Sequence, residues 1–262
     1  MLFLFIREKE DLLLYVALTA ATGLLGNISM WGYLKGQVEK PVLKELRPLR
    51  HLKETLVYFI PTIATSVYTI LDKTMLGWFS GENKSQNGYY EYATGFVNMA
   101  KILIMSFNAV MSARMSYLFG TGRMEEIHKR FQDSLDFVLL MAMPIMLGLA
   151  GIAAQFIPWF LGNGYLPVTF LMYVCSPLVL VVGLSDCIGS QILAPGGKRA
   201  QSGKVIVAGA MVNACLNFLL IPHFAALGAA AASVAAECFI TSLYLWLGRD
   251  FIKLKMLVRY GW

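Results

Sequence analysis

Charged residues are scarce in this sequence. Of its 262 residues, 15% are Asp, Glu, Lys or Arg, while 57% are hydrophobic. A soluble domain usually contains about 25% charged residues. The apolar residues form runs far longer than the ~10 alternating residues of a membrane barrel strand. The composition therefore excludes an ordinary soluble domain and predicts an all-α polytopic membrane protein.

Motifs of enzymes and metal sites are also missing. The sequence contains no HExxH, GxSxG or DxD motif and no glycine-rich phosphate-binding loop. Its four cysteines, Cys175, Cys187, Cys215 and Cys238, lie in apolar segments without a CxxC motif or a Cys/His cluster. Such cysteines are typically small, reduced packing residues. We expect a protein that is not an enzyme and has neither a metal site nor a bound cofactor.

The apolar runs predict seven transmembrane helices. Most of them reach the ~20 residues that a helix needs to cross a bilayer. Their expected ranges are 12–34, 54–79, 92–118, 135–157, 166–193, 205–222 and 224–247. Pro61, Pro144 and Pro177 interrupt three of these ranges and are expected to act as bend points. The last two helices are separated by Pro222 and His223 only, which predicts a tight hairpin there.

The basic residues predict the orientation. Sixteen Lys and Arg residues lie in the connections 35–53, 119–130 and 194–204 and in the tail after Leu247, but only three lie in the alternate connections. Basic connections face the cytoplasm in helical membrane proteins. We therefore expect segment 35–53 and the C-terminus in the cytoplasm. The net charge of +6 is explained by this orientation, so a nucleic-acid partner is not expected.

One predicted helix carries an unusual polar face. Within 92–118, residues three or four positions apart fall on one side of the helix: Thr94, Asn98, Lys101, Met105, Asn108 and Ser112. Lys101 lies near the middle of this helix, where an unpaired ammonium group costs several kcal/mol. Such a face points toward a protein interior or a watery cavity rather than lipid.

Further polar residues lie in the neighbouring helices. Asp72 is expected about 10 Å, and Lys101 about 14 Å, from the same membrane surface at 1.5 Å per residue, which leaves a salt bridge or a shared site open. Lys73 follows Asp72 directly and points in another direction. Glu237 lies in the last helix. These residues either bind something or only join helices by hydrogen bonds, and Arg114 can also reach the headgroups at its helix end.

Several motifs resemble those of one protein family. They are RHLKE (50–54), LDKTMLG (71–77), GYYEYA (88–93), the segment from Arg114 to Ser116, GSQIL-P-GK (189–198) and NACLNFLLIP…LGAAAASVAAE (213–237). In order and spacing, from about residue 10 to 250, the sequence resembles the Wzx-type polysaccharide flippases of the multidrug/oligosaccharidyl-lipid/polysaccharide exporter superfamily. One departure is Ala113, because the family has Pro before the arginine that corresponds to Arg114.

The resemblance implies a domain organisation. Family members have twelve to fourteen helices in two lobes around a central cavity. Residues 1–34 resemble the last helix of the N-terminal lobe, and 54–247 resemble the six-helix C-terminal lobe. Residues 35–53 then form a basic cytoplasmic linker and 248–262 a basic cytoplasmic tail. About five N-terminal helices have no counterpart here, so a missing N-terminal lobe or a partner chain is expected to complete the transporter.

The resemblance also implies a function. It predicts translocation of undecaprenyl-diphosphate-linked oligosaccharide repeat units across the bacterial inner membrane, with membrane lipids around the protein. The residues expected to receive the anionic headgroup are Lys101, Lys73, Arg114, Asn98, Asn108 and Thr94. Asp72 and Glu237 are expected to bind a coupling proton or Na⁺. The alternatives are a cation or drug exporter of the same superfamily and a non-transporting remnant. A membrane-embedded polymerase or ligase is disfavoured by the short outer connections, the longest of which is 80–91.

Overall fold

The computed structural model describes residues 12–34, 52–79 and 85–251. The chain divides into two units, Met1–His51 and Leu52–Trp262. The described part of the first unit is a 23-residue helix, α2 (Leu12–Leu34). The predicted linker 35–53 lies almost entirely, and the predicted tail 248–262 largely, outside the described residues.

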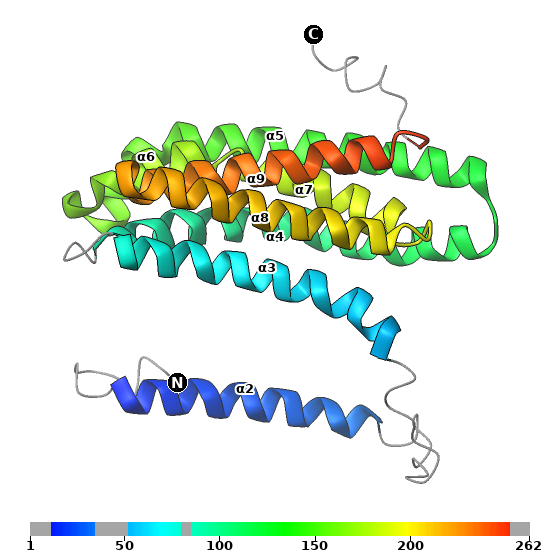
Figure 1. The fold of residues 1–262 in the computed structure, drawn as a ribbon, viewed down its shortest axis with the longest axis horizontal. Helices are drawn as coiled ribbons and strands as arrows, with labels where there is room; N and C mark the ends of the chain where they lie inside the picture. The colour runs from blue at the N-terminus through cyan, green and yellow to red at the C-terminus, as the bar shows by residue number, and fades with distance from the viewer. Residues whose placement is uncertain (1–11, 35–51, 80–84, 252–262) are drawn as a thin grey trace. The chain divides into compact units, whose positions relative to one another are not determined.

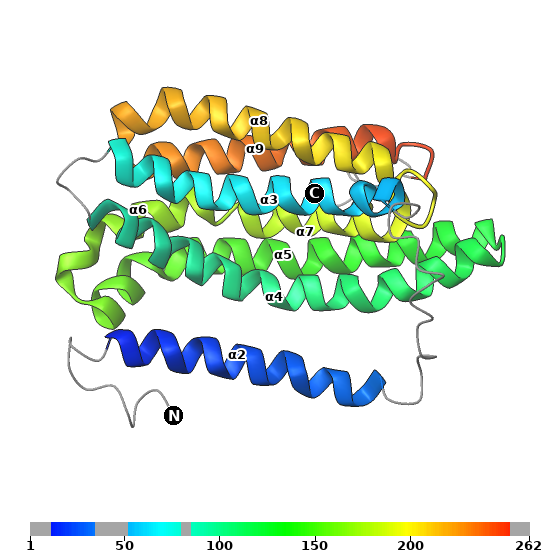
Figure 2. The same ribbon diagram turned by 60° about the horizontal axis from the view of Figure 1, so that its bottom comes forward.

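The second unit is a bundle of long helices that run side by side (Figures 1 and 2). Its elements are α3 (Leu52–Phe79), α4 (Ser85–Gly120), α5 (Met124–Leu161), the short 3-10 helix η4 (Asn163–Tyr165), α6 (Leu166–Cys175), α7 (Leu178–Ile188), the π-helical turn η5 (Gly189–Leu193), α8 (Arg199–Phe224) and α9 (Ala226–Leu247). Six helical segments among the described residues are long and apolar enough to cross a membrane, and α6 to η5 together form one of them. The predicted all-α polytopic membrane protein is confirmed.

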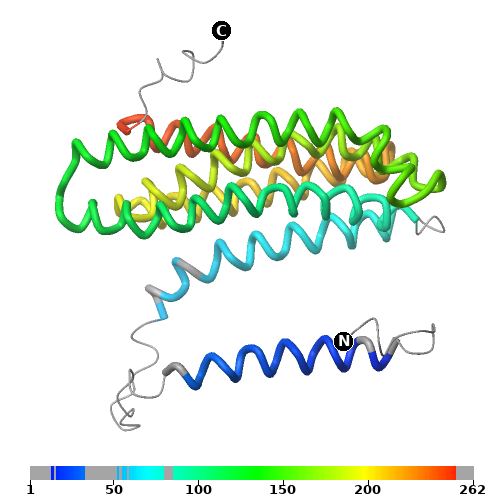
Figure 3. The backbone as a smooth tube through the Cα atoms, turned by 180° about the vertical axis from the view of Figure 1, so that it is seen from behind, coloured from blue at the N-terminus to red at the C-terminus, as the bar shows by residue number. Residues whose placement is uncertain are grey.

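Two helices are longer than the hydropathy pattern predicts. The expected helix 92–118 is α4 (Ser85–Gly120), and the expected helix 135–157 is α5 (Met124–Leu161). The predicted connection 119–130 is therefore wrong, because the turn between them is confined to residues 121–123. Polar residues continue these helices past their apolar parts, and Glu125 and Glu126 in the first turn of α5 favour its start through the helix dipole. Figure 3 shows this hairpin extending beyond the adjacent helix ends.

The three predicted bend points behave differently. Pro61 and Pro144 lie inside the unbroken helices α3 and α5. Pro177 follows Ser176 in the break between α6 and α7, so the expected helix 166–193 is interrupted. Beyond α7, the chain widens into the π-helical turn η5. Gly189 starts this turn beside Tyr244, where an added Cβ would lie 2.8 Å from the tyrosine ring. The interruption allows α7 and η5 to approach both α4 and α9.

The hairpin between α8 and α9 is even tighter than expected. Helix α8 continues through Pro222 and His223 to Phe224, and Ala225 alone makes the turn, with a φ of 47°. The small residues of α9 allow close contact, because Ala229, Ala230 and Ala232 are completely buried. A Cβ at Gly228 would lie 2.5 Å from the carbonyl oxygen of Leu220. The approach of the two helices therefore depends on a glycine at position 228.

Gly228→Ala tests this close contact. The added methyl group overlaps a backbone atom that cannot rotate away, so we expect a loss of about 1–3 kcal/mol in the free energy of unfolding. Gly148→Ala is the matched control, because nothing lies within 4 Å of a Cβ at that helical position. Thermal unfolding in detergent measures both variants. Equal melting temperatures for the two would contradict the predicted steric role of Gly228.

Candidate functional site

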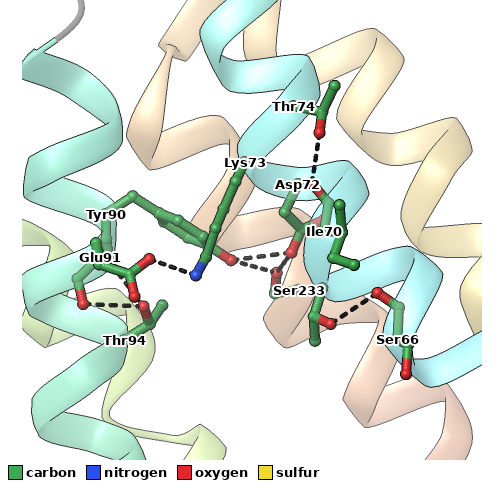
Figure 4. A network of polar contacts seen from close by, with 10 residues as sticks. Ser66, Ile70, Asp72, Lys73, Thr74, Tyr90, Glu91, Thr94 and Ser233 are labelled. Carbon is green, nitrogen blue, oxygen red and sulfur yellow. Dashed lines mark hydrogen bonds and ion pairs between the residues drawn. The ribbon is translucent and has the colours of Figure 1, made fainter. Parts of the chain in front are cut away.

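A buried carboxylate joins four helices of the bundle. Asp72 on α3 is 2% exposed. Its Oδ2 accepts hydrogen bonds from Tyr90 Oη of α4 at 2.9 Å and from Ser233 Oγ of α9 at 2.8 Å (Figure 4). Its Oδ1 accepts a bond from Asn217 Nδ2 of α8, and Asn217 Nδ2 also donates to Asn213 Oδ1 at 3.0 Å. The charge of Asp72 is therefore stabilised by neutral donors instead of the salt bridge to Lys101 that the sequence left open.

Lys73 points away from this cluster, as its position on the helix predicted. Its ammonium group pairs with the carboxylate of Glu91 on α4, and both side chains are about half exposed (Figure 4). Thr94 lies beside this pair and donates its hydroxyl to the carbonyl of Tyr90 at 2.8 Å. Lys73 and Glu91 thus form a second polar contact between α3 and α4, next to the contact made by Asp72.

These residues surround a small polar pocket, which we call the Lys101 pocket. It has a volume of about 140 Å³ and is formed by α3, α4, α7 and α9. Six of the eight residues that the sequence analysis selected line it: Asp72, Lys73, Thr94, Asn98, Lys101 and Glu237. The structure therefore brings most of the predicted residues to one place.

Lys101 and Glu237 both line this pocket. Among the described residues, no ion pair within 4.0 Å joins them. Glu237 Oε1 accepts a hydrogen bond from Tyr68 Oη at 2.8 Å, which holds the carboxylate on the α3 side.

A larger cavity adjoins the Lys101 pocket, and we call it the main cavity. Its volume is about 530 Å³, and it shares Tyr68, Val182 and Glu237 with the pocket. Further along the bundle, Ser112, Asp186 and Arg199 line it. The two spaces together form a polar path along the inner sides of α3, α4, α7 and α9.

Two predicted site residues lie elsewhere. Asn108 is completely buried. It donates through Nδ2 to Asp186 Oδ2 at 2.9 Å and accepts a bond from Gln191 Nε2 at 3.1 Å, so it joins α4 to α7 and η5. Arg114 lies near the end of α4, with Nη2 3.4 Å from Glu126 Oε1. Neither side chain lines the Lys101 pocket or the main cavity.

Four residues that line these spaces were not predicted from the sequence. Tyr90 and Glu91 lie just before the expected start of their helix at position 92, and the motif GYYEYA was the signal that contained them. Tyr68 counts as apolar in a hydropathy pattern, and Arg199 was assigned to a connection. Tyr90, Glu91 and Arg199 are polar groups at the edge of an apolar run, where hydropathy alone does not separate a lining residue from a headgroup contact.

Asn108 and Asn98 provide a matched test of two amides on one helix. Asn108→Ala leaves Asp186 and Gln191 without a buried partner, for which we expect a loss of about 1–3 kcal/mol in the free energy of unfolding. Asn98→Ala, at an exposed position that lines the Lys101 pocket, is expected to change stability by less than about 0.5 kcal/mol. Thermal unfolding distinguishes the two. Similar losses at both positions would contradict the structural role of Asn108.

The fold and these polar spaces define the chain as a multi-pass, all-helical membrane protein with a charged internal cavity. Comparison with known proteins then places it: residues 24–170 match the family described as polysaccharide biosynthesis proteins, and the chain belongs to that family.

Two relatives extend the comparison. A protein of Escherichia coli (strain K12), provisionally named an O-antigen transporter, is 24% identical over 250 residues, which are 95% of this chain and 60% of that relative. The structure of the lipid II flippase MurJ in an inward closed conformation is similar in fold, with a TM-score of 0.64 at 17% sequence identity. That similarity covers 82% of this chain and 49% of MurJ. The match therefore spans 60% of the first relative's length and about half of MurJ.

Proposed function

We propose that this chain is the C-terminal lobe, with one additional helix, of a transporter that moves undecaprenyl-diphosphate-linked oligosaccharides across the bacterial inner membrane. The observation that supports this most directly is Lys101, a cation within the membrane-spanning part of α4. It lines a pocket together with hydroxyl groups, the Asn98 amide and the carboxylates of Asp72, Glu91 and Glu237. Membrane proteins keep such residues for substrate or ion pathways. The proposed reaction makes and breaks no covalent bond.

The lining of the pocket carries two lysines, Lys73 and Lys101, and three carboxylates, Asp72, Glu91 and Glu237. Glu91 neutralises Lys73, and Asp72 is occupied by neutral hydrogen-bond donors. Lys101 is thus the cation that remains available to a substrate oxygen in this pocket, with Glu237 as its more distant counter-charge. Ammonium groups bind phosphate as point charges. We assign Lys101, Thr94 and Asn98 to the headgroup and Lys73 to the edge of its site.

The Lys101 pocket and the main cavity differ in volume, so we propose that they bind different parts of the substrate. Drug-sized ligands occupy pockets of about 300–1,000 Å³. The Lys101 pocket, at about 140 Å³, has room for one phosphate-sized group, whereas the main cavity, at about 530 Å³, has room for a sugar. A longer oligosaccharide needs additional space, which we propose is enclosed by a second lobe. That lobe belongs either to the same polypeptide or to a partner chain.

The basic connections support an orientation for this transporter. Under the positive-inside rule, segment 35–53 and the C-terminus lie in the cytoplasm. The start of α8 then lies at the cytoplasmic side, and the Lys101 pocket lies in the outer half of the membrane. A substrate that moves outward would pass the main cavity before it reaches Lys101.

Lys101→Ala tests the proposed function in a bacterial strain that lacks its own O-antigen transporter. The variant protein, expressed with its second lobe, is expected to reduce surface polysaccharide at least tenfold, because the headgroup loses its cation. Lys101→Arg keeps the charge and is expected to retain most of the activity. Lys129→Ala, an exposed residue of α5 outside both spaces, is the control. Normal surface polysaccharide with Lys101→Ala, at equal expression, would refute the assignment; resistance to cationic dyes would indicate a drug exporter instead.

A coupling ion is proposed at Asp72 or Glu237. Asp72 has the more complete set of oxygen atoms, because Ser233 Oγ and Asn213 Oδ1 lie in the same cluster. Asn217 Oδ1 is also buried, without a hydrogen-bond partner among the described residues. Membrane transporters bind Na⁺ or protons at such groups. Glu237 has one protein donor, Tyr68, and faces both spaces.

Asp72→Asn tests the ion site because it removes the charge but keeps the size of the side chain. With Na⁺ at about 100 times its dissociation constant, the wild-type protein is expected to gain about 2.7 kcal/mol in stability. Asp72→Asn is expected to lose this gain, and Glu237→Gln to retain it. Thermal unfolding in NaCl measures the gain, with choline chloride as the ionic-strength control. A full response to Na⁺ in Asp72→Asn would contradict this site; no response in the wild-type protein would leave the proton as coupling ion.

A further inference from the structure

An apolar groove lies at the contact between α3 and α8. This groove has a volume of about 400 Å³. Leu56, Ile60 and Val207 contribute apolar walls, and Lys204 is the only charged residue that lines it within the described part of the chain. Leu56 and Ile60 are exposed and belong to a helix that is long and apolar enough to cross a membrane.

Only a thin wall separates this groove from the main cavity. The two spaces share Val57, Pro61 and Gly203. Gly203 lies against Pro61, where an added Cβ would be 2.7 Å from the proline Cγ. The wall between the apolar groove and the main cavity is therefore formed by Val57, Pro61 and Gly203.

Cationic residues lie on both sides of this wall. Arg199 lines the main cavity and Lys204 lines the groove. The five residues between their positions on α8 correspond to a rotation of roughly 140° around the helix. Both belong to the first two turns of α8, at the membrane surface that the positive-inside rule assigns to the cytoplasm.

This arrangement matches a lipid whose polar head and hydrocarbon chain need different surroundings. A diphosphate lies at the depth of the headgroups and requires cations, while an isoprenoid chain requires an apolar surface in the bilayer. An ordinary phospholipid has no sugar to place in a cavity of about 530 Å³. The lipid-linked substrate uses both the groove and the adjoining cavity.

We propose that the groove between α3 and α8 binds the isoprenoid chain of the substrate as it enters, with its diphosphate between Lys204 and Arg199 before the headgroup moves on to Lys101, and with its sugars in the main cavity. The substrate then remains anchored in the lipid phase while its headgroup is inside the protein. The α3–α8 contact at Pro61 and Gly203 becomes the point where the lipid is held from the side. This inference rests on the proposed function and adds a lipid-binding site to it.

Photo-crosslinking of the unmodified chain tests the site directly. Purified protein in detergent micelles is exposed to undecaprenyl diphosphate that carries a diazirine on its isoprenoid chain, and the labelled peptides are identified by mass spectrometry. We expect labels on α3 near Ile60 and on α8 near Val207. An excess of unlabelled undecaprenyl diphosphate should suppress them at least fivefold. Inorganic diphosphate and phosphatidylglycerol should not.

Variants of the groove sharpen this test. Val207→Trp fills the groove and is expected to reduce labelling at least fivefold; Ile60→Trp, from the opposite wall, is the second such variant if Val207→Trp does not fold. Met211→Trp lies one turn further along α8, is exposed and lines neither the groove nor the main cavity, so its labelling should equal that of the wild type. Labels on other helices, or undiminished labelling in both groove variants, would overturn the proposal. Equal suppression by phosphatidylglycerol would also overturn it, because the groove would then be a site for ordinary membrane lipids.

The result of the crosslinking test is independent of the result of the polysaccharide test in "Proposed function". Lys101→Ala affects a different pocket and should leave groove labelling unchanged. If Lys101→Ala loses surface polysaccharide but Val207→Trp is labelled as strongly as the wild type, the proposed function is supported and the proposed groove site is refuted. If Lys101→Ala has normal surface polysaccharide but Val207→Trp abolishes labelling, the groove site is supported and the role of Lys101 in the proposed function is refuted.

Discussion

The arrangement of this bundle depends on how one carboxylate is satisfied without water. In a hydrocarbon environment, every buried polar group must find its partner within the protein. Asp72 does so with donors from α4, α8 and α9, so the one side chain of α3 fixes the position of three other helices. Moving α3 away would strand a charge together with a tyrosine, a serine and an amide. The same contact that stabilises the lobe therefore shapes one wall of its polar pocket.

A second constraint acts at the other end of α3. There Pro61 lies against Gly203 of α8, with 2.7 Å between the proline Cγ and the position of an added Cβ. The helix is thus held by a polar cluster around Asp72 and by close packing around Pro61. The main cavity lies on one side of this second contact and a hydrocarbon-lined groove lies on the other. This is the place in the lobe where the polar and lipid surroundings come closest.

The sequence was sufficient for the helices and for the centre of the site. Long apolar runs identify membrane helices because a bilayer demands them, and a polar residue inside such a run must face the interior. Four residues selected in this way line one pocket: Asp72, Asn98, Lys101 and Glu237. It could not place Asn108, since a lining amide and an amide buried between helices have the same periodicity.

The ends of the helices could not be predicted from hydropathy, for a different reason. Hydropathy marks where a helix leaves the apolar layer, whereas the helix itself continues as long as its backbone hydrogen bonds do. Tyr90 and Glu91 were therefore excluded from α4, although both contribute to the site. At Ala225 the sequence predicted the end of a helix too early. Proline at 222 predicted the turn, but the helix tolerates that proline and turns at a residue without any turn signal.

Glu237 provides the physical connection between the two polar spaces. It lines both the Lys101 pocket and the main cavity, and it interacts electrostatically with Lys101. A phosphate that approaches Lys101 competes with Glu237 for the same ammonium group, so binding in the pocket changes the electrostatic surroundings of a residue in the cavity wall. Because Tyr68 joins Glu237 to α3, this change also reaches the helix that carries Asp72. Coupling between the proposed ion at Asp72 and the proposed headgroup at Lys101 thus needs no distant relay, since both residues line one small pocket.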